Sequence, residues 1–130
     1  MHTEPESTLE SYYDALRRGD PLTPYFDPSS AVKFGVRESS FGADSVRDAL
    51  REQTETTTDW TVDSHRLTVD RRGEVAWFAD EVTLEWTARE DGTSRSFETR
   101  WSGTLLAADG TDEDPAWRFV AMHVSAPEAF

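Results

Sequence analysis

The stretch Trp117-Arg118-Phe119-Val120-Ala121-Met122-His123-Val124-Ser125-Ala126-Pro127 decides the fold. Apolar side chains occupy both alternating sets of positions, which is typical of a strand that is covered on both faces. The stretch ends in a His-x-Ser-x-Pro pattern and follows a segment that contains Phe97-Glu98-Thr99-Arg100-Trp101. We therefore expect two neighbouring strands near the end of the chain, the second of which packs against other parts of the protein on both sides.

Upstream of this stretch, periodicity and turn residues predict the remaining elements. Thr3-x-x-Glu6 resembles a capping box, and the helix after it ends at Arg17-Arg18-Gly19. A second helix is expected at 42–56, a short helical turn between the prolines of 20–28 and a short strand at 31–36. Longer strands are expected at about 59–70, 74–88, 94–108 and 116–125. This order predicts one α+β domain over residues 1–130, with a curved, mostly antiparallel sheet wrapped around the helices.

The composition is that of a globular protein. The chain has 130 residues, of which 36% are hydrophobic, and it includes five Trp and seven Phe. It has no Cys, no apolar leader at the N-terminus and no run of about 20 apolar residues, so we expect a cytoplasmic protein without disulfides or a membrane span. The three His are widely spaced, and the acidic loop at 109–114 lacks the spacing of a calcium loop. We therefore expect no metal site and no cofactor.

The charge of the chain is strongly one-sided. Its net charge is −13, and Lys33 is the only Lys among thirteen basic residues. Such a surface has no basic patch for nucleic acid or an anionic membrane. Two causes explain it. A salt-rich cytoplasm screens the self-repulsion, and a GC-rich genome removes Lys, Ile and Asn, the last two of which are absent from this chain. We favour a halophilic source.

The final two strands resemble those of SnoaL-like domains in the nuclear transport factor 2-like superfamily, and they are also similar to the association domain of calcium/calmodulin-dependent kinase. The resemblance implies a cystatin-like, cone-shaped pocket and a sheet whose outer face contacts a second protomer. We therefore expect a homodimer, which would also explain two apolar faces on the last strand. The alternative is that a long loop or the tail ending at Phe130 covers the outer face.

Three residues are candidates for chemistry in such a pocket. His123 has a side chain suited to a general base, although a structural role is the competing interpretation. The resemblance places Arg100 inward, where it could orient a carboxylate or carbonyl, or form a stabilising pair with Glu98. Asp80 could move a proton if it faces the pocket, but the alignment to the kinase domain favours Trp77 as the inward residue of that strand.

The predicted site therefore has catalytic candidates at Asp80 and His123. Its predicted ligand-binding residues come from four strands and the first helix: Arg100, Trp77, Tyr13, Trp60 and Met122. The favoured function is a dimeric pocket domain that binds a small, partly apolar organic ligand. The alternatives are an enzyme of the isomerase, cyclase or dehydratase type that uses a pocket acid or base, and a module that only assembles.

Overall fold

The computed structural model describes residues 4–36, 38–108 and 115–126. In chain order the elements are α1 (Pro5–Arg18), the 3-10 turn η1 (Thr23–Tyr25), β1 (Val32–Phe34), β2 (Ser39–Phe41), α2 (Ala43–Thr56), β3 (Thr57–Ser64), β4 (Thr68–Arg72), β5 (Val75–Ala88), β6 (Ser94–Ala107) and β7 (Trp117–Ser125). The sheet has the strand order β2-β1-β7-β6-β5-β3, and β4 also pairs with β5. Only β1 and β7 among these paired strands run parallel, so the predicted α+β fold with a mostly antiparallel sheet is confirmed.

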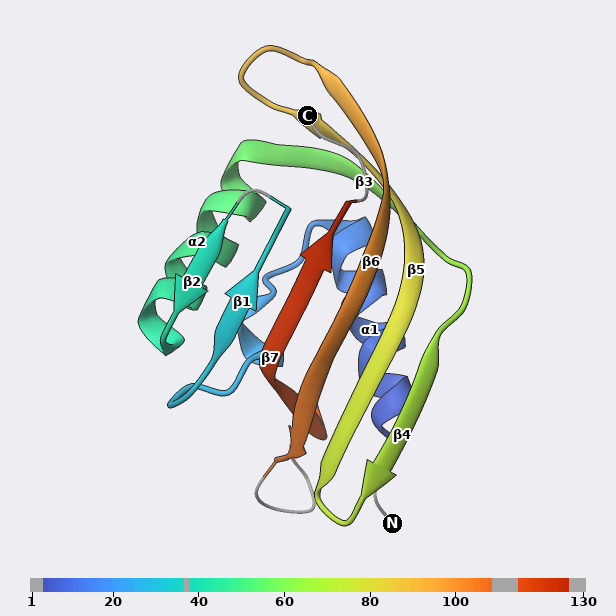
Figure 1. Cartoon of the computed structure of the whole chain (residues 1–130). Helices are drawn as coiled ribbons and strands as arrows, with labels where there is room; N and C mark the ends of the chain where they lie inside the picture. The colour runs from blue at the N-terminus through green and yellow to red at the C-terminus, as the bar shows by residue number, and fades with distance from the viewer. Residues whose placement is uncertain (1–3, 37, 109–114, 127–130) are drawn as a thin grey trace.

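The sheet curls around the helices. Figure 1 shows the long strands β5 and β6 bending over α1, while α2 lies beside the short strands β1 and β2. The inner face of the sheet and the two helices therefore enclose the hydrophobic core. Across the part of the chain that the structure describes, no helix is long and apolar enough to cross a membrane.

Helix α1 begins at a proline and ends at a glycine. Pro5 occupies the first turn, where its fixed φ angle suits a helix and its missing N–H costs nothing. The N-cap is Glu4, whose side chain makes no capping bond, and Thr3 of the expected capping box lies outside the described residues. Gly19 ends the helix as expected, in the left-handed region with φ of 73°. The inward side of the helix carries Leu9, Tyr12, Tyr13 and Leu16.

The strands differ from the prediction in two places. The single strand expected at 59–70 is two strands, since β3 pairs with the second half of β5 and β4 with the first half. The chain leaves the sheet between them because the N–H of Arg66 donates to the buried Asp80 carboxylate instead of to a strand neighbour, at 2.9 Å. Strand β2 was not expected, since three residues of the sequence Ser-Ser-Phe carry no recognisable alternation.

A β-bulge in β7 corrects the interpretation of the final strand. Leu105 pairs with Phe119, but the preceding Thr104 pairs with Ala121, so β7 contains one extra residue at this point. The extra residue reverses the alternation. As a result, the apolar residues on both sides of the bulge point inward: Trp117, Phe119, Met122 and Val124. The sequence suggested two apolar faces because the inward positions switch from odd to even residue numbers at the bulge. In the structure most of these apolar side chains lie on one inner face.

Strand β5 has the opposite parity to the one favoured by the sequence alignment. Its inner face carries Ala76, Phe78, Asp80, Val82 and Leu84, which are all buried. Trp77 lies on the outer face with 41% of its surface exposed, so the expectation that it points inward is wrong. The physical reason is that α1 covers the face with the longer apolar run, and a shift by one residue would expose that run.

Candidate functional site

A cavity of about 400 Å³ opens between the two helices and the inner face of the sheet. Tyr12 and Leu16 of α1 form one side, and the last turns of α2 form another. The sheet contributes the largest share of its apolar lining: Trp60, Leu84, Trp86, Phe97, Trp101, Met122 and Val124. This volume lies in the range of small-molecule sites, and the lining is mainly aromatic and aliphatic.

A second bulge builds the aromatic wall of the cavity. In β3 the register shifts between Thr58 and Thr61, and Asp59 takes a left-handed conformation with φ of 56°. Such a conformation is uncommon for a residue other than glycine, and it turns the next side chain, Trp60, into the cavity. The Trp60 ring stacks on Trp86 with centroids 4.7 Å apart, and its Nε1 donates to Thr57 Oγ1 at 2.9 Å.

The opposite wall carries an ion pair between a buried lysine and a half-buried glutamate. Lys33 lies in the middle of β1, and only 6% of its side-chain surface is exposed. Its ammonium pairs with Glu38, whose second carboxylate oxygen accepts a hydrogen bond from Ser40 Oγ at 2.8 Å. Gly35 makes this arrangement fit, because a Cβ atom there would lie 2.6 Å from Glu38 Cγ. The β1–β2 turn thus places one cation and one anion at the edge of an aromatic cavity.

Tyr12 adds a neutral hydrogen-bond donor beside this pair. Burial raises the pKa of the Tyr12 hydroxyl above its ordinary value, and the negative charge of Glu38 raises it further. The hydroxyl therefore keeps its proton at physiological pH. Among the described residues it makes no hydrogen bond of its own. Charges around the cavity balance, because Lys33 and Arg95 are matched by Glu38 and Glu52.

Of the predicted ligand-binding residues, two line the cavity. These are Trp60 and Met122. Tyr13 is buried on the inner side of α1, but its hydroxyl donates to the Asp80 carboxylate at 2.8 Å and does not reach the lining. Asp80 also accepts from Ser64 Oγ at 2.5 Å and from the Arg66 N–H at 2.9 Å. With these three donors, Asp80 ties α1 to the sheet and to the β3–β4 connection, and it is not among the lining residues.

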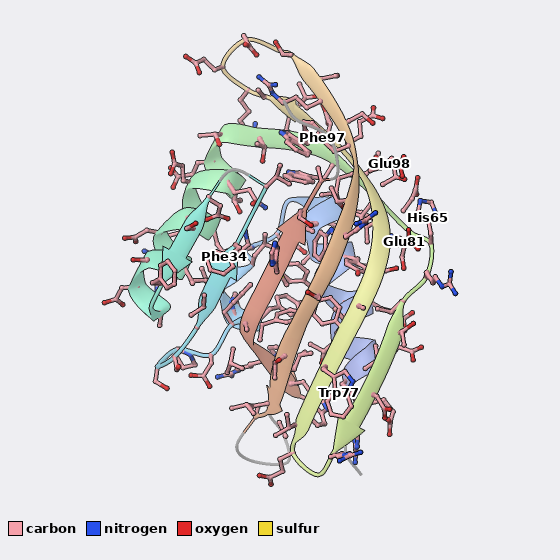
Figure 2. All side chains as sticks on the ribbon, viewed as in Figure 1. Phe34, His65, Trp77, Glu81, Phe97 and Glu98 are labelled. Carbon is pink, nitrogen blue, oxygen red and sulfur yellow. The ribbon has the colours of Figure 1, made fainter. Side chains whose placement is uncertain are left out.

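The other candidates lie on the outer face. Arg100 is exposed and stands opposite Glu81 across β5 and β6, so the expectation that it points inward is wrong. His123 is also exposed, with its ring 5.6 Å from that of Phe34, because the bulge in β7 reverses its face. Trp77 lies on the same outer face. Figure 2 shows Trp77, Glu81 and Glu98 on the long strands and Phe34 on β1.

The outer face has a hollow of its own. A recess of about 410 Å³ is lined by His65, Arg66, Glu81, Glu98, Thr99 and Arg100. His65 Nε2 lies 2.7 Å from Thr83 Oγ1, which in turn donates to the Glu98 carboxylate. Most of these side chains are exposed, and no group of three His, Cys, Asp or Glu within the described ranges could hold a metal ion. The lining of this recess is polar, whereas that of the inner cavity is mainly apolar.

Sequence reasoning missed the Lys33–Glu38 pair. One signal was present, since Lys33 is the only Lys of the chain and sits in an otherwise apolar Ala-Val-Lys-Phe segment. A charged residue in such a strand is rarely buried without a partner. Its partner could not be predicted, because Glu38 reaches it through a turn at Gly35 whose geometry no periodic pattern reveals.

Comparisons with known proteins agree with this architecture. The family model described as "SnoaL-like domain" matches residues 6–129. A nuclear transport factor 2-like superfamily protein from Salmonella enterica has a TM-score of 0.78 at 18% identity, covering 95% of this chain and 88% of that one. A ketosteroid isomerase-like protein from Erwinia carotovora has a TM-score of 0.74 at 15% identity, covering 95% and 94%.

A provisionally assigned dehydratase of the same superfamily, from Streptomyces avermitilis, has a TM-score of 0.78 at 14% identity and covers 96% of this chain and 95% of that one. At such identities the likeness shows the fold alone. No curated protein sequence matches the chain.

Proposed function

Because the chain belongs to the SnoaL-like domain family, we propose that it binds a small, partly apolar organic molecule in its inner cavity. The observation that carries this proposal is the cavity of about 400 Å³, with an aromatic wall on one side and one half-buried ion pair on the other. Enclosed apolar surface supplies affinity, and a few fixed polar groups supply orientation. The proposal needs no residue of the outer face.

Tryptophan fluorescence tests ligand binding directly. Trp60, Trp86 and Trp101 line the cavity, so a bound ligand changes their emission. The titration uses a panel of ring-bearing ketones, phenols and carboxylates in about 2 M KCl, where surface repulsion is screened. Ala49→Phe should abolish the response by filling the cavity, whereas Trp77→Phe, on the outer face, should keep it. A panel without a single responding compound would contradict the proposal.

A second candidate function is catalysis of the isomerase, cyclase or dehydratase type. The observation that favours it is a base and an acid in the cavity lining, at Glu38 and Lys33, together with the Tyr12 hydroxyl group. In this function Glu38 removes a proton next to a carbonyl group, and the Lys33 ammonium and the Tyr12 hydroxyl stabilise the resulting enolate oxygen. The earlier candidates are less suited, since Asp80 is fully hydrogen-bonded and His123 faces outward.

Deuterium exchange separates the second function from binding alone. Ketones that bind are incubated in D₂O, and exchange at the carbon next to the carbonyl is followed by NMR. Glu38→Gln should stop the exchange while the ketone still binds, and Glu52→Gln at the cavity edge should leave exchange unchanged. Binding without exchange for every ketone would remove the catalytic candidate and leave the binding function.

We also propose that the chain forms a homodimer through its outer sheet face and that its surface is adapted to high salt. The dimer was expected partly because the sequence suggested two apolar faces on the last strand, and the bulge in β7 places most of those side chains on the inner face instead. What supports it now is apolar surface on the outer face, where Val75, Trp77 and Leu106 are each 38–41% exposed. Residues 127–130, which could have covered this face instead, lie outside the described part of the chain. The net charge of −13 supports the salt adaptation.

A further inference from the structure

The polar end of the inner cavity has more hydrogen-bond donors than acceptors. The Lys33 ammonium carries three N–H groups, and among the described residues it bonds only Glu38. The Tyr12 hydroxyl, on a residue that is 1% exposed, makes no hydrogen bond with the described residues. Glu38 pairs with Lys33 and its charge acts on Tyr12, and both donors belong to residues that line the cavity. Both donors are open to the cavity, where water satisfies them, so a ligand that displaces this water must offer an acceptor oxygen in its place.

The charge around that point favours an uncharged acceptor. Glu38 already neutralises Lys33, so a ligand carboxylate would place two anions around one ammonium. The remaining charges of the lining, Arg95 and Glu52, cancel each other. The chain as a whole carries −13, which also disfavours anions near its surface. A carbonyl oxygen accepts from both donors without adding a charge.

We infer that the ligand of this cavity is an uncharged, ring-bearing carbonyl compound whose oxygen accepts hydrogen bonds from Lys33 and Tyr12. The inference rests on the proposed binding function and specifies its ligand class. The ring lies against the stacked Trp60 and Trp86, on the far side of the cavity from the ion pair. Glu38 acts as a selectivity residue in this site, because its charge excludes carboxylates.

Calorimetric titration with a matched pair of compounds tests the ligand class. Acetylnaphthalene and naphthoate share a ring and a carbonyl carbon, but only naphthoate is charged. In about 2 M KCl, the wild-type chain should bind acetylnaphthalene at least ~10-fold more tightly than naphthoate. Glu38→Gln should reverse this order and improve naphthoate binding by about tenfold, because Lys33 then lacks its counter-ion. Lys33→Met should weaken acetylnaphthalene binding by about tenfold.

Glu55→Gln is the matched control. It removes the same charge from an exposed position of α2 that does not line the cavity, so the order of the two compounds should stay as in the wild type. Equal or tighter binding of naphthoate by the wild type overturns the ligand class but leaves the binding function in place. If fluorescence detects other apolar ligands while neither naphthalene compound binds, the ligand class is again overturned. If no compound of either set binds, the binding function itself fails.

Discussion

At the scale of single residues, the catalytic candidate Asp80 has a structural role, because it accepts a hydrogen bond from Tyr13 and so connects the sheet to α1. The Asp80 carboxylate is 4% exposed and accepts hydrogen bonds from a helix side chain, a strand side chain and a connecting backbone N–H. A hydrogen bond to a charged group contributes about 1.5–3 kcal/mol to stability. In the sequence, Asp80 is a single acidic residue on the apolar face of its strand. This pattern is typical both of a catalytic acid and of a buried carboxylate that holds structural elements together by hydrogen bonds.

Replacing Tyr13 tests the structural role of Asp80. Tyr13→Phe removes one of the three donors and keeps the ring, so the free energy of unfolding should fall by about 1.5–3 kcal/mol. Urea unfolding followed by circular dichroism measures this change. Ser7→Ala, on the exposed side of the same helix, should change it by less than about 0.5 kcal/mol. Ligand titration of Tyr13→Phe should match the wild type, and a loss of binding in a folded variant would argue for a place in the site.

The same tyrosines predict how stability depends on pH. Burial raises the pKa of both Tyr12 and Tyr13, and the hydrogen bond to Asp80 raises that of Tyr13 further. In the unfolded chain both titrate near pH 10, so stability is complete below about pH 10 and is lost as pH rises toward the folded-state values.

Each tyrosine should contribute a slope of about −1.4 kcal/mol per pH unit in that window. Urea unfolding between about pH 8 and 11 measures the slope. Tyr13→Phe should remove roughly half of it, since one buried hydroxyl remains. Identical slopes for the variant and the wild type would mean that Tyr13 ionises equally in both states.

At the scale of elements, the bulges in β3 and β7 decide which side chains reach the cavity. Without the extra residue in β7, Met122 and Val124 would leave the inner face, and without the turn at Asp59, Trp60 would leave it. Periodicity predicted both strands but neither bulge, because an extra residue changes parity without changing composition. The bulges place Met122 and Trp60 in the cavity lining, whereas Arg100 and Trp77, which analogy placed inward, lie on the outer face.

Gly103 provides a test of the close packing beside the β7 bulge. A Cβ atom at this position would lie 2.3 Å from the Ala121 carbonyl oxygen and 2.8 Å from the Phe78 ring. Backbone cannot move aside as a side chain can, so Gly103→Ala should cost about 3 kcal/mol of unfolding free energy. Ser102→Ala, its exposed neighbour on the same strand, should change stability by less than about 0.5 kcal/mol. Urea midpoints compare the two, and equal midpoints would show that the strands can separate locally.

At the scale of the whole molecule, the dense negative charge sets the conditions under which the fold is stable. A net charge of −13 on a 14.7 kDa chain opposes the compact state through self-repulsion. Raising the salt concentration toward 1 M shortens the screening length to about 3 Å.

The melting temperature should therefore rise between about 0.1 and 2 M KCl, as differential scanning calorimetry can measure. Sucrose at equal osmolality is the control, since it stabilises by exclusion without screening charge. A melting temperature that responds to both solutes alike would remove the charge argument.

The proposed dimer is also a property of the whole molecule. Light scattering in high salt should give twice the chain mass of 14.7 kDa. Trp77→Asp places a charge in the apolar part of the outer face and should produce monomers, whereas Ser7→Asp on α1 should not. Wild-type monomers at all concentrations would contradict the dimer.

The order of elements and the fold class were predictable from the sequence because turn residues and apolar periodicity are local signals. Gly73 and Gly92, in the turns of two hairpins, take the positive φ angles that glycine allows in such turns. The site was much less predictable. Its polar pair comes from Lys33 and Glu38, whose meeting depends on a turn, on burial by a distant helix and on pairing with the last strand.

That last pairing has a consequence for how the protein is made. Among the described residues, the pair of strands β1 and β2 joins the rest of the sheet through a parallel ladder of three residue pairs between β1 and β7. These partners are separated by most of the chain, so the ladder closes late in folding and late in synthesis. A ligand that binds Lys33 requires this ladder to be formed, and it then stabilises the pairing of two segments that are distant in the sequence. Occupancy of the cavity would thus act as a check that folding is complete.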